Sequence, residues 1–571
     1  MLKKIFQRNG IHRGLIVVLL GFLFLASAGL FYNFGLATTV NDETPSFVAA
    51  LKMVGNLTLR PAYQTFYYMP LPAYAMLPFA LLSVAALPVF GIATTASAIR
   101  EFVILDFAYL LPAARLASVL YALATLALFY FIGLRIFRDR RRALIGAYLL
   151  GTSLLFFQLA HFGKVWSLQL FLLTYAFWSA IALCDETIPE KRRYIHAALA
   201  IAASFGVNVI AAVVYVAFFV AHFLRMKGRS FIEKIFHRPF LMTHILILLL
   251  ILLLFWLNPY GILNYARHIS SALGISLPGD FINAGIAGAY CGKGAFMQYT
   301  YYLRTLFGYE PLLFLLAIVG IAGFWRTYRR EASIFGAFFV VYFATITALS
   351  ILGANNCEPR YAAPIVLPLA LFASFGVSRF LAGLSWTTQK VALSLFALVM
   401  LMVPVLYDVK LLLPSTRLSA REWVVANVPD GAKIITIDEK LDLPEDLATV
   451  KNIGERAPAH ATVKRSYLAT YPGRIVAPAY FVYNPSFGSY GAGQDFEYLI
   501  ISWWDPDDRV RQLEHITGLG LFDDLERLRR FPGDARDRTI SIDLPNNMEN
   551  PVWRLWSQKQ NGPVVDIYRL R

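Results

Sequence analysis

The residues best suited to chemistry in this chain are two adjacent carboxylates, Asp42 and Glu43, in the segment NDETPSF. They follow closely on an apolar run from Leu15 to Phe31. Carboxylates at a membrane surface could bind a divalent metal, accept a proton from a hydroxyl group, or contact a polar substrate. The structural alternative is that Asp42 caps a helix that runs through Phe47 to Lys52.

A second set of candidates is basic and could bind an anion. Arg360, followed by Tyr361, lies in the segment EPRYAAPIVLPLAL, where a loop enters an apolar run. An arginine in this position can extend to lipid headgroups, or its planar guanidinium can bind a lipid phosphate. The short turn LAHFGKVWS offers Lys164 as a second phosphate contact, and His161 as either an interfacial residue or a substrate contact.

Aromatic residues make up 15% of the chain, and Tyr67 and Tyr68 stand in one dense group, YQTFYYMPLPAY. Such a group is typical of the aromatic belt at a membrane interface, and it could also provide stacking faces for a sugar. No glycine-rich phosphate loop, HExxH motif or cysteine–histidine metal spacing is present. This absence argues against a nucleotide-driven pump and a zinc protease, and no cofactor is indicated beyond a divalent metal at the acidic pair.

These candidates must be positioned by membrane helices. The 571 residues are 58% hydrophobic and only 15% charged, and the apolar residues fall in runs of the length that crosses a bilayer. The net charge of +16 arises from basic clusters in short loops, which is the positive-inside pattern rather than a nucleic-acid footprint. The cytoplasmic clusters lie within residues 135–142, 191–193, 225–238 and 326–330.

The pattern predicts an α-helical polytopic membrane protein with about eleven membrane helices in residues 1–407. Residues 33–111 and 258–310 form two long external loops. The first loop contains Tyr67 to Phe90, whose prolines we expect to break it into short interfacial helices; a pair of crossings is the alternative. Tyr194 to Leu224 is expected to be a hairpin of two short helices with its break near Gly206 and Asn208.

Residues 408–571 are polar and contain no run that could span a membrane. The segment SAREWVVANVPDGAKIITID predicts a helix, a turn and a strand, and FEYLIIS and PVVDIYRL predict further strands. We therefore expect a small α/β domain. The alternation of crossings places this domain on the extracytoplasmic side of a plasma or inner membrane.

Taken together, these features resemble the C superfamily of membrane glycosyltransferases (GT-C). They resemble specifically the branch that contains the protein mannosyltransferases and the lipid A aminoarabinose transferases. The resemblance rests on NDET, LRPAYQTFYYMPLPAY, ARLASVLYALATLALFYFIGLRIFRDRRRALIGAYLLGTS, EPRYAAPIVLPLAL, AREWVVANVPDGAKI and GPVVDIYRL. Their order covers nearly the whole chain.

The resemblance implies a hexosyl or pentosyl transferase with a polyprenyl-phosphate-linked sugar donor. The acceptor would be a hydroxyl group of a lipid, glycan or protein on the extracytoplasmic face. By position, Asp42 matches the catalytic base of the family, and Arg360 matches a residue near the lipid phosphate. One departure stands out, because many relatives have a second acidic residue where this chain has His161, Lys164 and Ser167.

Two further classes of function remain open: a transporter of lipid or sugar, and a non-catalytic assembly protein on a similar membrane fold. A transporter would be expected to show ionisable groups within its helices or internal repeats, and neither is evident in the sequence. Among the cysteines, Cys291 and Cys357 fall in external loops, whereas Cys184 is cytoplasmic. Because external compartments are often oxidising, Cys291 and Cys357 could form a disulfide.

Overall fold

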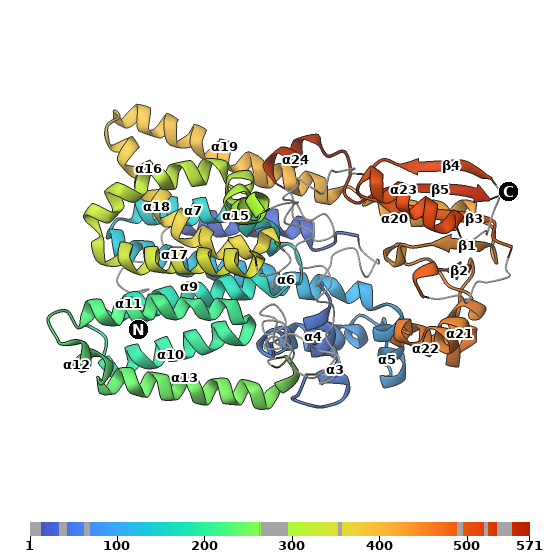
Figure 1. Cartoon of the computed structure of the whole chain (residues 1–571), viewed down its shortest axis with the longest axis horizontal. Coiled ribbons are helices and arrows are strands. Elements are labelled where there is room, and N and C mark those ends of the chain that lie inside the picture. The colour runs from blue at the N-terminus through green and yellow to red at the C-terminus, as the bar shows by residue number, and fades with distance from the viewer. Residues whose placement is uncertain are drawn as a thin grey trace.

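The structure is a computed structural model, and it describes residues 13–33, 43–61, 69–261, 263, 295–351, 357–487, 495–518, 524–533 and 551–570. The molecule is elongated (Figure 1). A helical bundle occupies one end, and a five-stranded sheet with its helices occupies the other. The segment formed by α3 (Pro45–Gly55), α4 (Leu71–Val89) and α5 (Ala96–Leu105) lies between these two parts.

Seven helices in the described residues are long and apolar enough to cross a membrane, and two bent pairs raise this number to nine. The chain is therefore an integral membrane protein, although the expected count of eleven is not confirmed. The expected count also included α2 (Arg13–Ala26), α10 (Glu190–Val207) and α11 (Tyr215–Arg225), which are shorter or begin with charged residues. The seven are α4, α6 (Leu111–Phe137), α9 (Trp166–Leu183), α13 (Arg238–Leu257), α17 (Arg329–Ile351), α18 (Ala363–Ala382) and α19 (Trp386–Leu412).

One of the expected helix breaks is present and another is absent. The break near Asn208 is confirmed: α10 ends at Val207, and the Asn208 side chain accepts a hydrogen bond from the backbone of Ile210 at the start of a 3-10 turn, η3 (Val209–Val214). The expected interruption by prolines was wrong, because α4 is continuous and contains Pro78 and Pro88. A proline removes one backbone donor and bends a helix, but packing against neighbouring helices can hold the helix together.

Two helix pairs are bent at short breaks. The sequence predicted a single helix for the first pair (143–160), whereas it placed residues 295–309 of the second pair in the second external loop. α7 (Arg140–Gly151) meets α8 (Leu154–Ala160) at 64°, and α15 (Ala295–Tyr309) meets α16 (Pro311–Thr327) at 103°. The two breaks are joined by the buried Glu310, whose Oε1 accepts hydrogen bonds from Ser153 Oγ (2.6 Å) and Leu155 N (2.8 Å). This carboxylate satisfies amide groups at the start of α8 that have no partner within the helix.

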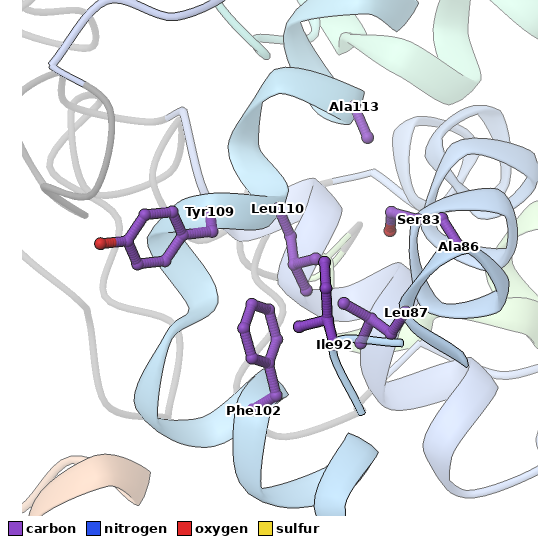
Figure 2. A pocket seen from close by; sticks show the side chains of 8 residues that line it. All are labelled: Ser83, Ala86, Leu87, Ile92, Phe102, Tyr109, Leu110 and Ala113. Atoms are coloured by element: carbon purple, nitrogen blue, oxygen red, sulfur yellow. The ribbon is translucent and has the colours of Figure 1, made fainter. Parts of the chain in front are cut away.

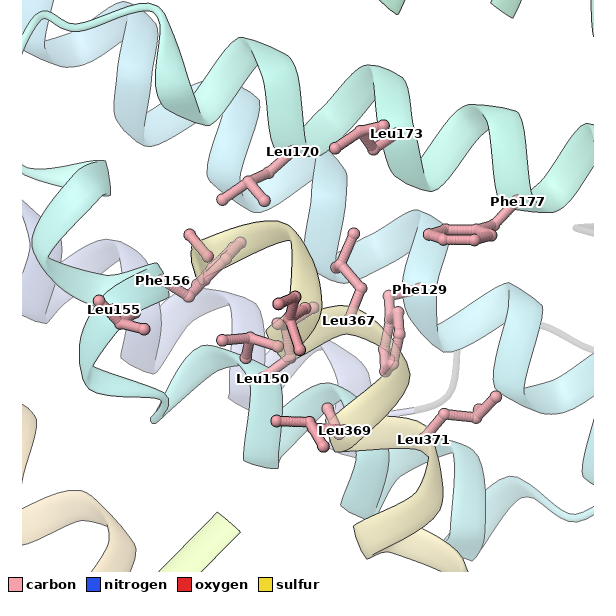
Figure 3. Packing of buried hydrophobic residues seen from close by; sticks show 14 of the residues in the cluster. Phe129, Leu150, Leu155, Phe156, Leu170, Leu173, Phe177, Leu367, Leu369 and Leu371 are labelled. Atoms are coloured by element: carbon pink, nitrogen blue, oxygen red, sulfur yellow. The ribbon is translucent and has the colours of Figure 1, made fainter. Parts of the chain in front are cut away.

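The core of the bundle forms around α18, from which Leu367, Leu369 and Leu371 project among the surrounding helices (Figure 3). Phe129 of α6 and Phe177 of α9 lie in the same cluster. The fully buried run in α18 explains why its sequence is almost uniformly apolar, since a helix surrounded by other helices has no polar face. Its N-terminal end carries the candidate residue Arg360 in a 3-10 turn, η4 (Pro359–Ala362).

Close contact between α16 and α18 depends on two glycines. A Cβ atom at Gly320 would lie 2.0 Å from the carbonyl oxygen of Phe372, and one at Gly376 would lie 2.8 Å from that of Leu316. Small residues let the backbones of membrane helices approach each other in this way.

We expect Gly320→Ala to destabilise the protein by about 1–3 kcal/mol, because the methyl group must displace a backbone carbonyl. This loss should exceed the gain in helix propensity from alanine. The thermal unfolding midpoint of the purified protein in detergent measures it. Gly336→Ala in α17 is the matched control, since its nearest neighbour would be the Trp325 ring at 3.5 Å. Equal midpoints for the two variants would contradict the close helix contact.

The C-terminal sheet has the strand order β2–β1–β3–β5–β4. β1 (Lys433–Thr436) pairs in parallel with β2 (Phe481–Tyr483) and β3 (Tyr498–Trp503), whereas β5 (Val564–Leu570) is antiparallel to β3 and to β4 (Leu525–Phe531). In this register Ile435 lies opposite Tyr483 and Leu499. The expected small α/β domain is confirmed. Its helices are α20 (Thr416–Asn427), α21 (Leu447–Arg456), α22 (Val463–Thr470) and α23 (Pro506–Thr517), whereas α24 (Val552–Ser557) packs against α19 of the bundle.

Asp566 in β5 is a fully buried carboxylate that contacts side chains from three neighbouring elements of this domain. Its oxygens accept hydrogen bonds from Arg530 Nε (2.6 Å), Arg530 Nη2 (2.9 Å) and Trp503 Nε1 (3.1 Å), and Arg509 lies within 3.3 Å. Burial alone would raise the pKa of Asp566, but these donors and charges outweigh burial and lower the pKa below its ordinary value of 3.8. The ionised form is thus favoured by folding.

A lowered pKa means that Asp566 contributes stability above its unfolded-state pKa and that this contribution disappears as the pH falls through the folded-state pKa. We expect Asp566→Asn to lower the unfolding midpoint at pH 7. We also expect the difference between wild type and variant to shrink below about pH 4. Thermal unfolding of the full-length protein across this pH range measures both effects. A difference that stays constant down to the acid limit would contradict the ionic role of Asp566.

Candidate functional site

The candidate site is centred on the turn of residues 161–166, which joins α8 to α9. We call this segment the 161–166 turn. Its backbone is held at two points by other parts of the bundle: Gly163 N donates to Glu43 Oε1 (3.1 Å), and Lys164 O accepts from Ser118 Oγ in α6 (3.3 Å). A turn fixed in this way can present its side chains in one orientation.

Glu43 forms a buried ion pair with Arg115 near the start of α6. Arg115 Nε lies 2.6 Å from Glu43 Oε1, and Arg115 Nη2 lies 3.0 Å from Glu43 Oε2. Glu43 and Arg115 are 2% and 1% exposed. This bidentate geometry is the strongest form of arginine–carboxylate contact, and the burial makes both partners dependent on each other.

Arg115 also binds the chain where it leaves α2. Its Nη1 donates to the carbonyl oxygens of Tyr32 (2.6 Å), Leu30 (3.2 Å) and Gly29 (3.4 Å). The Glu43–Arg115 pair therefore fixes three segments together: the end of α2, the start of α6 and the 161–166 turn. Asp42 itself lies outside the described residues. The N-cap position of α3, however, is Thr44, which makes no side-chain cap hydrogen bond.

Arg360, Tyr361 and the first residue of α9 come together at the other end of the turn. The Arg360 guanidinium carbon lies 5.4 Å from the centre of the Trp166 ring, and the Tyr361 ring meets Trp166 edge-on at 5.0 Å. Arg360 is also ion-paired with Glu358, and both are buried. The structure thus brings two predicted phosphate-binding residues against the turn that carries the third, Lys164.

Lys164 and His161 are both buried, at 2% and 0% exposure. The Lys164 ammonium lies 5.9 Å from the centre of the Phe162 ring. The His161 ring contacts Asp408 and the Phe157 carbonyl through its two nitrogens. The charged form of a buried ammonium group, such as that of Lys164, is stabilised by a nearby anion.

Three further predicted residues lie outside the part of the chain that the structure describes. Tyr67, Tyr68 and Cys291 lie outside the described residues, so their proposed roles remain predictions. Cys357 takes part in a disulfide bond and Cys184 is a free thiol; the pairing of Cys357 with Cys291 remains a prediction. In the described part of the chain, no group of three or more His, Cys, Asp or Glu side chains could hold a metal ion.

A pocket of about 390 Å³ lies elsewhere, between α4, α5 and the start of α6 (Figure 2). Phe102, Leu110, Ile92 and Leu87 face its interior, and Ser83 is one of the few polar residues that line it. None of the residues predicted from the sequence lines this pocket. Its lining is mostly apolar and contains no charged residue.

Sequence reasoning missed three residues of the site, Arg115, Trp166 and Asp408, and also the buried Glu310 at the start of α8. Arg115 could have been found as a lone charge near the start of an apolar helix, because such charges need a buried partner. Asp408 was assigned to the beginning of the soluble domain, yet it lies in α19 and is buried against His161. Glu310 and Trp166 gave no sequence signal beyond their places next to helix ends.

Comparisons with solved structures identify similar chain folds at low sequence identity. The crystal structure of ArnT from Cupriavidus metallidurans bound to undecaprenyl phosphate is 12% identical, with a TM-score of 0.49, and the match covers 96% of this chain and 97% of that chain. The crystal structure of ArnT from the same organism in the apo state is 12% identical, with a TM-score of 0.47 and the same coverage of both chains.

The arabinofuranosyltransferase AftD from Mycobacteria is 13% identical with a TM-score of 0.46, and the match covers 98% of this chain and 40% of that chain. No protein-family model matches the chain, and no curated protein matches it.

Proposed function

We propose that the chain is a GT-C-type glycosyltransferase that moves a sugar from a polyprenyl-phosphate-linked donor to an acceptor hydroxyl. The observation that carries this proposal is the contact of Arg360 and Tyr361 with Trp166, at one end of the turn that also carries Lys164. The same turn is tied directly to Glu43, the neighbour of Asp42. The order of motifs in the sequence supports the same assignment. The active face would be extracytoplasmic.

The proposed chemistry divides between an anionic and a cationic group. Asp42 takes the proton of the acceptor hydroxyl group. At the same time, the oxygen of this hydroxyl group forms a bond to the anomeric carbon of the sugar. The bond from this carbon to the phosphate oxygen breaks, and the polyprenyl phosphate leaves with the electron pair. Arg360 and Lys164 stabilise the negative charge of the leaving phosphate. Because phosphate is already a good leaving group, charge stabilisation suffices there.

The direct test is to incubate the purified protein with polyprenyl-phosphate sugars and to follow donor consumption. Release of polyprenyl phosphate that depends on an added acceptor supports the transferase. A protein that binds the donor and never consumes it, with any acceptor of the three classes, would instead fit a transporter or an assembly protein.

The position of Arg360 favours a ligand-binding arginine over one that reaches the headgroups. Its side chain is only 7% exposed and stacks on Trp166. Arg360→Lys keeps the charge but loses the planar fork, so we expect KM for the donor to rise about tenfold, which corresponds to about 1.4 kcal/mol. The kcat should change less than KM.

Arg142→Lys is the matched control for Arg360→Lys. Arg142 also has an acidic partner, Asp139, and an aromatic neighbour, Phe375, but it lies at the start of α7. We expect KM of this control to equal that of the wild type. An unchanged donor KM in both Arg360→Lys and Arg360→Ala would show that Arg360 only packs against its neighbours.

A further inference from the structure

His161 and Asp408 form a buried contact between residues 247 positions apart in the sequence. His161 Nε2 lies 2.8 Å from Asp408 Oδ1, and His161 Nδ1 lies 2.7 Å from the carbonyl oxygen of Phe157. A carbonyl oxygen only accepts, so Nδ1 carries a hydrogen. The second contact is then either imidazolium with carboxylate, or neutral imidazole with a carboxylic acid. In both forms the pair has no net charge, which is the condition for burying it at low cost.

The histidine ring is held tightly in one orientation. The Phe157 ring lies 4.4 Å and the Tyr407 ring 5.3 Å from it, centre to centre, and both meet it edge-on. On another side, a Cβ atom at Gly29 would come within 2.5 Å of His161 Cδ2. The ring thus occupies a space that exists only because residue 29 is glycine. With both nitrogens engaged and no exposed surface, His161 has no ring nitrogen left for a substrate.

The contact connects the candidate site to the base of the C-terminal domain. His161 begins the 161–166 turn, and Asp408 lies two residues before Lys410 in α19. Lys410 Nζ donates to the carbonyl oxygen of Gln558 (2.5 Å), and the Lys410 carbonyl accepts from Asn561 Nδ2 (2.9 Å). The turn is therefore anchored to α19 at the point where the soluble domain also attaches.

We propose that His161 and Asp408 are a positioning pair, which holds the 161–166 turn so that Lys164 and Trp166 meet the donor phosphate together with Arg360. This proposal rests on the proposed function. Asp408 Oδ2 has no hydrogen-bond partner in the described residues. In the described residues, the hydrogen bond to His161 is therefore the one that a substitution of Asp408 removes. For this reason Asp408 is a better residue to substitute than His161.

The test measures binding of undecaprenyl phosphate to the full-length protein in detergent, together with the thermal unfolding midpoint. We expect Asp408→Ala and His161→Ala each to raise Kd about tenfold, because loss of the pair shifts the turn. The double variant should bind no more weakly than either single variant, since the two residues act as one unit. Asp408→Asn can still hydrogen-bond to Nε2, and we expect it to recover most of the affinity.

Asp566→Asn provides a control, since it removes another buried carboxylate that is paired within the C-terminal sheet. This variant should lose stability and keep the wild-type Kd at temperatures where it is folded. If Asp408→Ala behaves in the same way, with a lower midpoint and an unchanged Kd, the positioning role is overturned while the proposed function stands. If the wild type binds no polyprenyl phosphate and consumes no donor, the proposed function fails and the positioning role fails with it.

Discussion

Asp42→Asn is expected to lower turnover by about 10²-fold or more while donor binding changes little. The amide has nearly the same shape as the carboxylate but accepts a proton very poorly, so the acceptor hydroxyl loses its base. The neighbouring Glu43 is clamped by Arg115 and by the amide of Gly163, and it is therefore occupied by structural contacts. Initial rates of transfer at saturating donor and acceptor measure the effect.

A carboxylate outside the site provides the control for Asp42→Asn. Glu101 in α5 is ion-paired with Arg474 of the C-terminal domain at 2.8 Å, and Glu101→Gln should leave turnover close to that of the wild type. Partly exposed ion pairs contribute little to stability, so this variant should also fold normally. Near-normal transfer by Asp42→Asn would remove Asp42 from the mechanism, and a non-catalytic protein would tolerate Asp42→Ala without any change in its function.

The helices and the soluble domain could be predicted because their signals are local. α9 begins and ends at the predicted residues, Trp166 and Leu183, and the strands read from FEYLIIS and PVVDIYRL are β3 and β5. Periodicity and run length depend only on neighbours in sequence. The same reasoning failed at Pro78, where packing of α4 against its neighbours overrides the local preference.

The arrangement of the site was less accessible, because it depends on contacts between distant residues. Arg360 and the 161–166 turn were both predicted as candidates, but nothing in the sequence indicated that Trp166, the last residue of this turn, would contact Arg360. Asp408 and Glu310 illustrate the same limit. Each is a single acidic residue near a helix end, and only the tertiary structure shows that they bind His161 and the start of α8.

The role first considered for Glu43 changes with this arrangement. To accept a proton, one of the roles open to the acidic pair, Glu43 would need to reach a substrate hydroxyl, but its two oxygens are engaged with Arg115 and Gly163. We infer that Glu43 and Arg115 position the segment that carries Asp42. The carboxylates of the acidic pair would then have different tasks, one in proton transfer and one in fixing the geometry.

Arg115→Ala should be among the most damaging single substitutions in the chain. It leaves the Glu43 carboxylate buried without a counter-charge and three carbonyl oxygens without their donor, and breaking a buried pair in this way costs about 3–5 kcal/mol. We expect a strongly lowered unfolding midpoint and loss of transfer.

The double variant Glu43→Gln/Arg115→Met separates stability from positioning. It removes both charges and should recover much of the unfolding midpoint, because apolar or neutral replacements of a buried pair are often tolerated. Transfer should nevertheless stay low, since the bidentate contact between residues 43 and 115 and the hydrogen bonds from Arg115 to the carbonyl oxygens at the end of α2 are then lost. An active double variant would show that the pair only stabilises the fold. An Arg115→Ala variant with the unfolding midpoint of the wild type would show that the pair does not stabilise the fold.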